Sequence, residues 1–289
     1  MKILLAYKTY KALDSEQKQL IQVKTIEASR TPADWLTFLQ KVSEFDRIGD
    51  GARSAAGKIG GVFAVLALVF LFAPAMSSFI GGIFYFSVEA ILLFIAIFNG
   101  VAYFRLKKND LPNRLRQFIV PVISVLREDM DANESLNLKM DLRGPTIPEK
   151  EHDELPGEGG YPSVTITNFI DPWFSGTASL ADGSALNWQA TDYVRRRKIK
   201  KRNSRGKIKY KTKYKVQTVI DTRLGLRSES YTPQTSTTDS EVVLKAGEKK
   251  NQLRVRRGVE STDPNAIPDF EIFLSAVTDA YKQVKVNKA

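Results

Sequence analysis

A long apolar stretch at residues 59–104 constrains the fold of this chain more than any other feature. It holds one charged side chain, Glu89, and divides into apolar runs of 18 residues (59–76) and 20 residues (79–98). A helix needs about 20 residues to cross the roughly 30 Å hydrocarbon core of a bilayer. The sequence therefore predicts a transmembrane helical hairpin. The soluble alternative is a buried pair of core helices, which would need a large domain around it.

Basic residues lie at both outer ends of the predicted hairpin, whereas its connecting turn at 74–78 has none. They are Arg53, Lys58, Arg105, Lys107 and Lys108. Basic flanks stay on the cytoplasmic side of a membrane. We therefore expect a two-pass protein of a bacterial inner membrane or a plasma membrane, with both termini cytoplasmic.

Small residues near the start of each apolar run favour close helix packing. Glycines at this spacing let helix backbones approach one another, either within the hairpin or between subunits. A homo-oligomer is therefore expected. The glycines are Gly57, Gly60 and Gly61 in the first helix and Gly81 and Gly82 in the second.

Glu89 lies eleven residues into the second run, near the middle of the predicted span. A charge at that depth is costly and usually faces a helix bundle or a water-filled path. Two interpretations stay open: a hydrogen bond to a partner helix, or passage of ions or protons. The hairpin with its acid resembles the proton-carrying subunits of rotary ATPase rings. Those hairpins turn through a polar cytoplasmic loop, however, so their function is not carried over.

The chain carries no sign of an enzyme. It has 289 residues, no cysteine and one histidine, His152. These counts exclude disulfides and cysteine nucleophiles and argue against a His-rich metal site. The Gly51–Gly57 segment is one residue too long for a phosphate-binding loop, and Ile59 replaces the required Ser or Thr. We expect no cofactor and no metal.

The soluble segments differ in period. Helical spacing is found at 14–28, at 31–48 with Thr31 as N-cap, at 109–130 with a kink at Pro121, and near the C-terminus. We expect four parts. They are a cytoplasmic helical segment (1–58), the hairpin (59–104), an amphipathic juxtamembrane helix (105–131) and a β-rich domain (132–289).

Alternating residues and turn signals predict the β-rich domain. Asp182-Gly183 is a strong hairpin signal, and an acidic linker at 144–162 contains His152. The fold class expected is therefore membrane α+β, with an antiparallel sandwich or open barrel closed by a helix at 269–285. The strands expected are 136–143, 164–170, 174–180, 185–193, the two arms of a ribbon within 193–220, 241–244 and 253–257.

The net charge of +11 is concentrated in that ribbon. Thirteen Lys and Arg and no acidic residue lie between Arg195 and Lys215, whereas the rest of the chain is close to neutral. A four-residue turn at 203–206 would place Lys200 opposite Lys209 and put the cations on one face. In this register Lys198 also faces Lys211 and Arg196 faces Lys213. The anion-binding residues expected are Arg196, Lys198, Lys200, Arg202, Lys207, Lys209, Lys211, Lys213 and Lys215.

Three anionic partners fit such a ribbon. They are acidic lipid head groups of the cytoplasmic leaflet, an acidic protein, and nucleic acid with Tyr210 or Tyr214 stacking on bases. The function expected is a non-enzymatic membrane adaptor or scaffold that binds one of them. The alternative is a subunit of an ion- or proton-conducting assembly that uses Glu89.

Overall fold

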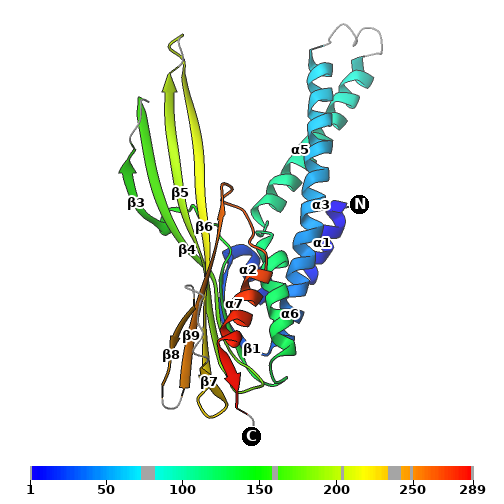
Figure 1. Ribbon diagram of the computed structural model, residues 1–289. Coiled ribbons are helices and arrows are strands. Elements are labelled where there is room, and N and C mark those ends of the chain that lie inside the picture. Colours follow the sequence, from blue (N-terminus) through cyan, green and yellow to red (C-terminus); the bar gives the residue numbers. More distant parts are fainter. Residues whose placement is uncertain are drawn as a thin grey trace. The chain divides into compact units, whose positions relative to one another are not determined.

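The computed structural model shows an α+β protein (Figure 1). It describes residues 2–72, 82–157, 162–202, 205–233, 242–247 and 250–287. It divides into two compact units. Unit 1 comprises Met1–Gln22 and Leu39–Leu111, and unit 2 comprises Val23–Phe38 and Pro112–Ala289. Unit 1 is helical, and unit 2 contains the β-sheet.

Unit 1 is built on two long helices, most of α3 (Pro32–Leu71) and α5 (Gly82–Lys108). Both are long and apolar enough to cross a membrane. The soluble helix expected at 31–48 and the first apolar run form one helix, α3, of 40 residues. Thr31 caps it, because its hydroxyl accepts a hydrogen bond from the Asp34 N–H at 3.2 Å. The turn predicted at 74–78 lies outside the described residues.

Two shorter helices complete unit 1. The first, α1 (Lys2–Ala12), was not expected from the sequence. The second, α2 (Ser15–Val23), is shorter than the helix expected at 14–28. Lys24 has a φ of 62°, which ends the helix, and Thr25–Arg30 form strand β1 instead. The expectation of helix beyond Val23 is wrong because pairing with β2 overrides the local pattern.

The helix expected at 109–130 is also different. It consists of a π-helical turn, η1 (Leu115–Ile119), followed by α6 (Val120–Glu128), with Pro121 at the start of α6 rather than at an interior kink. Its apolar face packs on the sheet, since Phe118 lies 5.2 Å from the ring centre of Trp173. This face is therefore part of the core of unit 2.

Eight strands form one antiparallel sheet, in the order β1-β2-β4-β5-β6-β9-β8 with β3 beside β4. The expected antiparallel β-rich domain is confirmed, but the described strands form one large sheet and not the two of a sandwich. Curvature of this sheet into an open barrel stays a prediction. The bounds are β2 Leu136–Asp141, β3 Glu151–Pro156, β4 Ser163–Ser179, β5 Ala185–Arg202, β6 Ile208–Arg227, β8 Val242–Lys245 and β9 Lys250–Ser261. The small second sheet pairs β7 (Tyr231–Pro233) with β10 (Val284–Val286).

Several strands are longer than expected. The strands predicted at 164–170 and 174–180 are one strand, β4, with an irregularity between Pro172 and Phe174. The linker expected at 144–162 contains a 3-10 turn, η2 (Pro148–Lys150), and strand β3. The hairpin predicted at Asp182-Gly183 is confirmed, with Gly183 at a φ of 78° that favours glycine.

One face of the sheet carries the core of unit 2. The η1 turn and the C-terminal helix α7 (Glu271–Lys282) cover it, through Phe118 against Phe174 and Phe273 against Trp188, with ring centres 6.1 and 5.5 Å apart. We call this the core face, and the opposite side of the sheet the open face. The even-numbered residues of β5, such as Trp188, point to the core face.

Candidate functional site: the cationic ribbon

The candidate site is the distal part of strands β5 and β6, residues 195–202 and 208–215, which we call the ribbon. Its register differs by one residue from the expected one, because Lys200 faces Tyr210 and not Lys209. The strand β6 begins at Ile208, so five residues rather than four separate the arms. Lys207 thus lies in the turn. The expected pairings of Lys198 with Lys211 and Arg196 with Lys213 are wrong for the same reason.

This shift distributes the cations over both faces of the ribbon. Side chains directly opposite one another in an antiparallel pair share a face. The nine predicted anion-binding residues therefore do not form one surface. The open face carries Arg195, Arg197, Lys201, Lys209, Lys211, Lys213 and Lys215, and the core face carries Arg196, Lys198, Lys200 and Arg202 beside Tyr214, Thr212, Tyr210 and Ile208.

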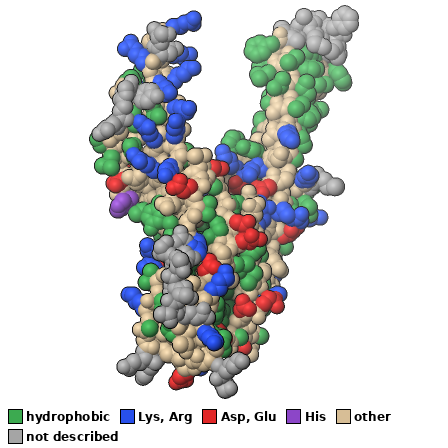
Figure 2. Space-filling model, in the orientation of Figure 1, with side chains coloured by type: hydrophobic (Ala, Val, Ile, Leu, Met, Phe, Trp, Pro, Cys, Tyr) green, Lys and Arg blue, Asp and Glu red, His purple; other side chains and the backbone are tan. Residues whose placement is uncertain are grey.

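Like charges oppose each other on the open face of the ribbon. The pairs are Arg195 with Lys215, Arg197 with Lys213 and Lys201 with Lys209. Each such pair destabilises a sheet by roughly 0.2–1 kcal/mol. A concentration of Lys and Arg is visible over this part of the molecule in Figure 2. The open face therefore favours a negatively charged surface next to it.

Three cations of the open face have no acidic partner among the residues that the structure describes. Lys215 forms an ion pair with Glu260 at 3.1 Å. By contrast, Lys209, Lys211 and Lys213 are exposed and form no ion pair or hydrogen bond with other residues that the structure describes. Their ammonium groups are available to a partner.

The acidic segment before the ribbon is engaged elsewhere. On β3, the Glu154 carboxylate accepts a hydrogen bond from the Thr167 hydroxyl at 3.2 Å, and the Asp153 carboxylate accepts one from the Asn168 amide at 2.6 Å. Both donors belong to β4, the strand between β3 and β5. These two carboxylates therefore help to hold β3 on the sheet.

One cation of the core face belongs to the fold. The Arg196 guanidinium lies 4.7 Å from the ring centre of Phe169 and donates a hydrogen bond to the Thr167 hydroxyl at 3.3 Å. Phe169 packs with Val194 and Val216 in a small apolar cluster. Beyond this cluster Ile199, on the open face, is still buried at 2% exposure, whereas Tyr210 is 76% accessible.

A shallow hollow marks the base of the open face. It has a volume of about 290 Å³ and is lined in part by Arg195, Lys215, Tyr193, Gln217 and His152. The sequence did not single out Arg195 or His152 for this place. His152 lies in this hollow because β3 pairs with β4. The residue pattern at 144–162 does not indicate that pairing.

The outer edge of the ribbon is unpaired. Strand β9 pairs with β6 only as far as Val216, which faces Ser261. Among the described strands, none lies on the far side of β6 between Ile208 and Lys215. Strand β4 pairs with β5 as far as Lys200, which faces Ser163. The ribbon therefore has a neighbouring strand on its β5 side and an open edge on its β6 side.

A second group of charges, buried in unit 2, is satisfied internally. Arg114 is 4% exposed and donates a hydrogen bond to the Asp192 carboxylate at 3.0 Å. The other oxygen of Asp192 accepts hydrogen bonds from the Trp173 Nε1 at 3.1 Å and from the Thr218 hydroxyl at 2.7 Å. This network ties η1 to the strands of the sheet, which is a folding role.

Lys150 extends the buried network toward η2. Its ammonium lies 2.6 Å from an Asp171 oxygen and 3.1 Å from an Asp141 oxygen. Burial raises the pKa of Asp171 above its usual range, although Lys150 favours the ionised form. Asp171 thus belongs to the buried network of unit 2.

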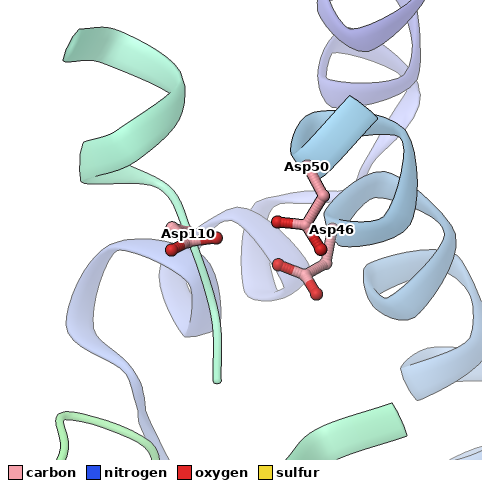
Figure 3. A group of neighbouring side chains, drawn as sticks. All are labelled: Asp46, Asp50 and Asp110. Atoms are coloured by element: carbon pink, nitrogen blue, oxygen red, sulfur yellow. The ribbon is translucent and has the colours of Figure 1, made fainter. Parts of the chain in front are cut away.

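Three carboxylates meet in unit 1, those of Asp46 and Asp50 on α3 and of Asp110 after α5 (Figure 3). Their oxygens lie within 4.8 Å of one another. Arg53 forms ion pairs with Asp50, at 3.0 Å, and with Asp110. The Asp46 carboxylate accepts a hydrogen bond from the Leu111 N–H at 3.0 Å. These contacts describe an ion-paired joint between the helices, and we assign no metal to it.

Two of the predicted packing glycines of α3, Gly57 and Gly60, face the C-terminal part of α5 and not its start. A Cβ atom on Gly57 would lie 3.3 Å from the Tyr103 ring, and one on Gly60 would lie 3.2 Å from Asn99. Both helices therefore approach closely at these positions. Gly61 and Gly82 have open space around them, and Gly81 lies outside the described residues.

Glu89 is half-buried on α5 and forms no hydrogen bond or ion pair with the residues that the structure describes. Both interpretations of Glu89 therefore stay predictions.

Comparisons of the chain with protein-family models, curated proteins and solved structures gave no significant match. The function is therefore argued from the chain's own residues.

Proposed function

We propose that this chain is a two-pass membrane adaptor or scaffold whose ribbon binds anionic lipid head groups. The observation that carries the proposal is the open face of the ribbon. Seven cations lie there on two paired strands, and Lys209, Lys211 and Lys213 have no ionic partner among the described residues.

The energies favour a binding role for these cations. The three like-charge pairs together destabilise the ribbon by roughly 0.6–3 kcal/mol. Each Lys or Arg near an anionic leaflet contributes about 1 kcal/mol of binding free energy. The three lysines without an ionic partner among the described residues, Lys209, Lys211 and Lys213, would contribute about 3 kcal/mol, which equals the upper end of the internal repulsion. An anionic surface would therefore offset that repulsion as well as bind the ribbon.

Lipid head groups are favoured over the other anionic partners because of the helical hairpin. Two helices of suitable length and apolarity are present, and α5 ends in Arg105, Lys107 and Lys108. In the proposed orientation both soluble segments lie on the side of the anionic leaflet. The hairpin would keep the ribbon at a high effective concentration near that leaflet.

The test compares two charge-matched variants of the full chain in zwitterionic nanodiscs. One changes Lys209, Lys211 and Lys213 of the open face to Gln, and the other changes Lys198, Lys200 and Arg202 of the core face to Gln. At about 1 kcal/mol per cation, the open-face variant should bind anionic vesicles about 100-fold more weakly. The core-face variant should lose less, because Lys198, Lys200 and Arg202 point to the opposite side of the strands from the open face.

Other outcomes of this titration contradict the proposal. Equal losses in both variants would mean that overall charge, and not the open face, drives binding. Unchanged binding in both would remove the ribbon as an anion-binding site. Stronger, salt-sensitive binding to RNA or to an acidic protein than to vesicles would replace lipid as the partner.

The alternative function is an ion- or proton-conducting assembly. The observation that favours it is Glu89, half-buried on α5 without a partner among the described residues. Flux through reconstituted vesicles should then fall in the Glu89→Gln variant. Absence of flux in the unmodified protein would exclude conduction.

A further inference from the structure

We propose that a groove between α1 and α5 holds one acyl chain of an anionic phospholipid, with its phosphate at Arg105. The groove lies within unit 1 and is separate from the ribbon. The inference rests on the proposed membrane placement of the hairpin, and it adds a lipid site that neither the ribbon nor the two apolar runs implies.

The groove has the size and lining of a site for an apolar ligand. Its volume is about 400 Å³, within the usual range of ligand sites. Leu4 and Tyr7 of α1 form one wall, Val101 and Ala102 of α5 form the other, and Phe45 of α3 contributes to the lining. Almost all the lining is hydrocarbon or aromatic carbon. Such a surface favours a hydrocarbon chain over a polar ligand.

The groove is held open by packing and not by its occupant. Ala6 of α1 is buried, and the Tyr10 ring lies 5.4 Å from that of Phe45. These contacts fix α1 on α3. Leu4 and Tyr7 remain 64% and 65% exposed, although they lie outside both apolar runs. Large exposed apolar side chains beside a preformed groove indicate an interaction surface.

Charge at one end of the groove selects the head group. Arg105 lines the groove and belongs to the basic last turn of α5, together with Lys107 and Lys108. From Phe98 to Arg105 the helix rises by roughly 10 Å. With Arg105 at head-group level, the groove extends into the upper acyl region of the leaflet. A phosphate at Arg105 would pair with the charged end of the groove, and an acyl chain toward Phe98 would fill its apolar end.

The experiment measures phospholipid retained by the full chain after detergent purification, by native mass spectrometry. Ala102→Phe should fill the groove and reduce retained lipid about tenfold. Ala90→Phe is the matched control, because Ala90 is an exposed alanine of the same helix outside the groove. Arg105→Gln should keep the groove but abolish the preference for anionic over zwitterionic phospholipid.

Equal lipid retention in the Ala102→Phe and Ala90→Phe proteins would overturn the inference. A dimer that dissociates only in the Ala102→Phe protein would show that a second copy occupies the groove, which also overturns it. Membrane fractionation separates this failure from failure of the proposed function. If Ala102→Phe stays in the membrane and its ribbon still binds vesicles, only the groove is affected. A chain that is not in the membrane at all removes both proposals.

Discussion

The two ends of the β5–β6 pair use charge in opposite ways. At the base, charged groups are paired: Asp192 accepts a hydrogen bond from buried Arg114, and Asp221 contacts Arg254 and Arg256. In the ribbon the cations oppose other cations, as Lys201 opposes Lys209. The same two strands therefore change from a charge-balanced sheet to a charge-unbalanced extension.

This difference separates residues that fold the protein from residues that are presented to a partner. Folding requires buried charges to be paired, because an isolated buried charge is costly. Exposed cations carry no such requirement. The comparison thus assigns Asp192 and its neighbours to stability and agrees with the proposed binding role of the open face of the ribbon. Three substitutions test that division, in order of decreasing effect on stability.

The largest effect is expected for Asp192→Ala. It removes the principal acidic partner of Arg114 and the acceptor of Trp173 and Thr218. Breaking a buried ion pair from one side destabilises a protein by about 3–5 kcal/mol. The thermal midpoint, followed by tryptophan fluorescence of the full chain, should fall accordingly. Lys211→Ala in the ribbon is the control and should stay within about 0.5 kcal/mol of the unmodified protein. Equal losses of stability in the two variants would contradict the division between folding charges at the base and exposed charges in the ribbon.

An intermediate effect is expected for Asp182→Asn at the base turn. Burial raises the pKa of Asp182, but hydrogen bonds from Ser184, Tyr231 and Tyr281 more than offset it, so the net pKa is lowered. Losing these charged hydrogen bonds should destabilise the protein by about 1.5–3 kcal/mol. The midpoint of thermal unfolding at neutral pH measures the loss.

The same turn makes stability depend on pH. The hydrogen bond to Asp182 raises the pKa of Tyr231 from 10.0 to about 12. Its contribution is present below pH 10 and is lost as the pH rises through about 12. The contribution of Asp182 is present above its ordinary value of 3.8 and is lost as the pH falls. In Asp182→Asn the tyrosinate absorbance titration should move down toward 10.0. An unchanged titration would exclude this contact.

The smallest change in stability is expected for Lys209→Glu, and its sign is opposite. It places a carboxylate across from Lys201 and should stabilise the ribbon by roughly 0.2–1 kcal/mol. It should also weaken binding to anionic vesicles, because two units of positive charge are lost. Both quantities are measured on one preparation. Loss of stability together with unchanged binding would show that the ribbon cations serve the fold.

Local patterns predicted those elements whose causes are local. Asp182-Gly183 supplies the turn that joins β4 and β5, and Thr31 with Pro32 marks the start of α3. Elements that depend on distant pairing were missed. Residues 25–30 form β1 because β2 lies beside them, and nothing in their own spacing indicates this.

The candidate site was predicted in composition but not in arrangement. Alternation of Lys in 207–215 places those lysines on one face in either register, but it does not say which cations of β5 share that face. That depends on the length of the turn, and one extra residue moves Arg196 to the other side. The partnership of Arg114 with Asp192 joins residues 78 positions apart. No spacing rule connects them.

The open edge of β6 between Ile208 and Lys215 has a consequence for solubility. An unpaired strand edge exposes backbone donors and acceptors that invite the edge of another molecule, and lysines are a common means of preventing such pairing. Alternating ammonium groups along this edge would repel an identical edge before backbone hydrogen bonds form. The lysines that we propose to bind an anionic surface would thus also keep neighbouring copies from joining strand to strand and forming fibrils.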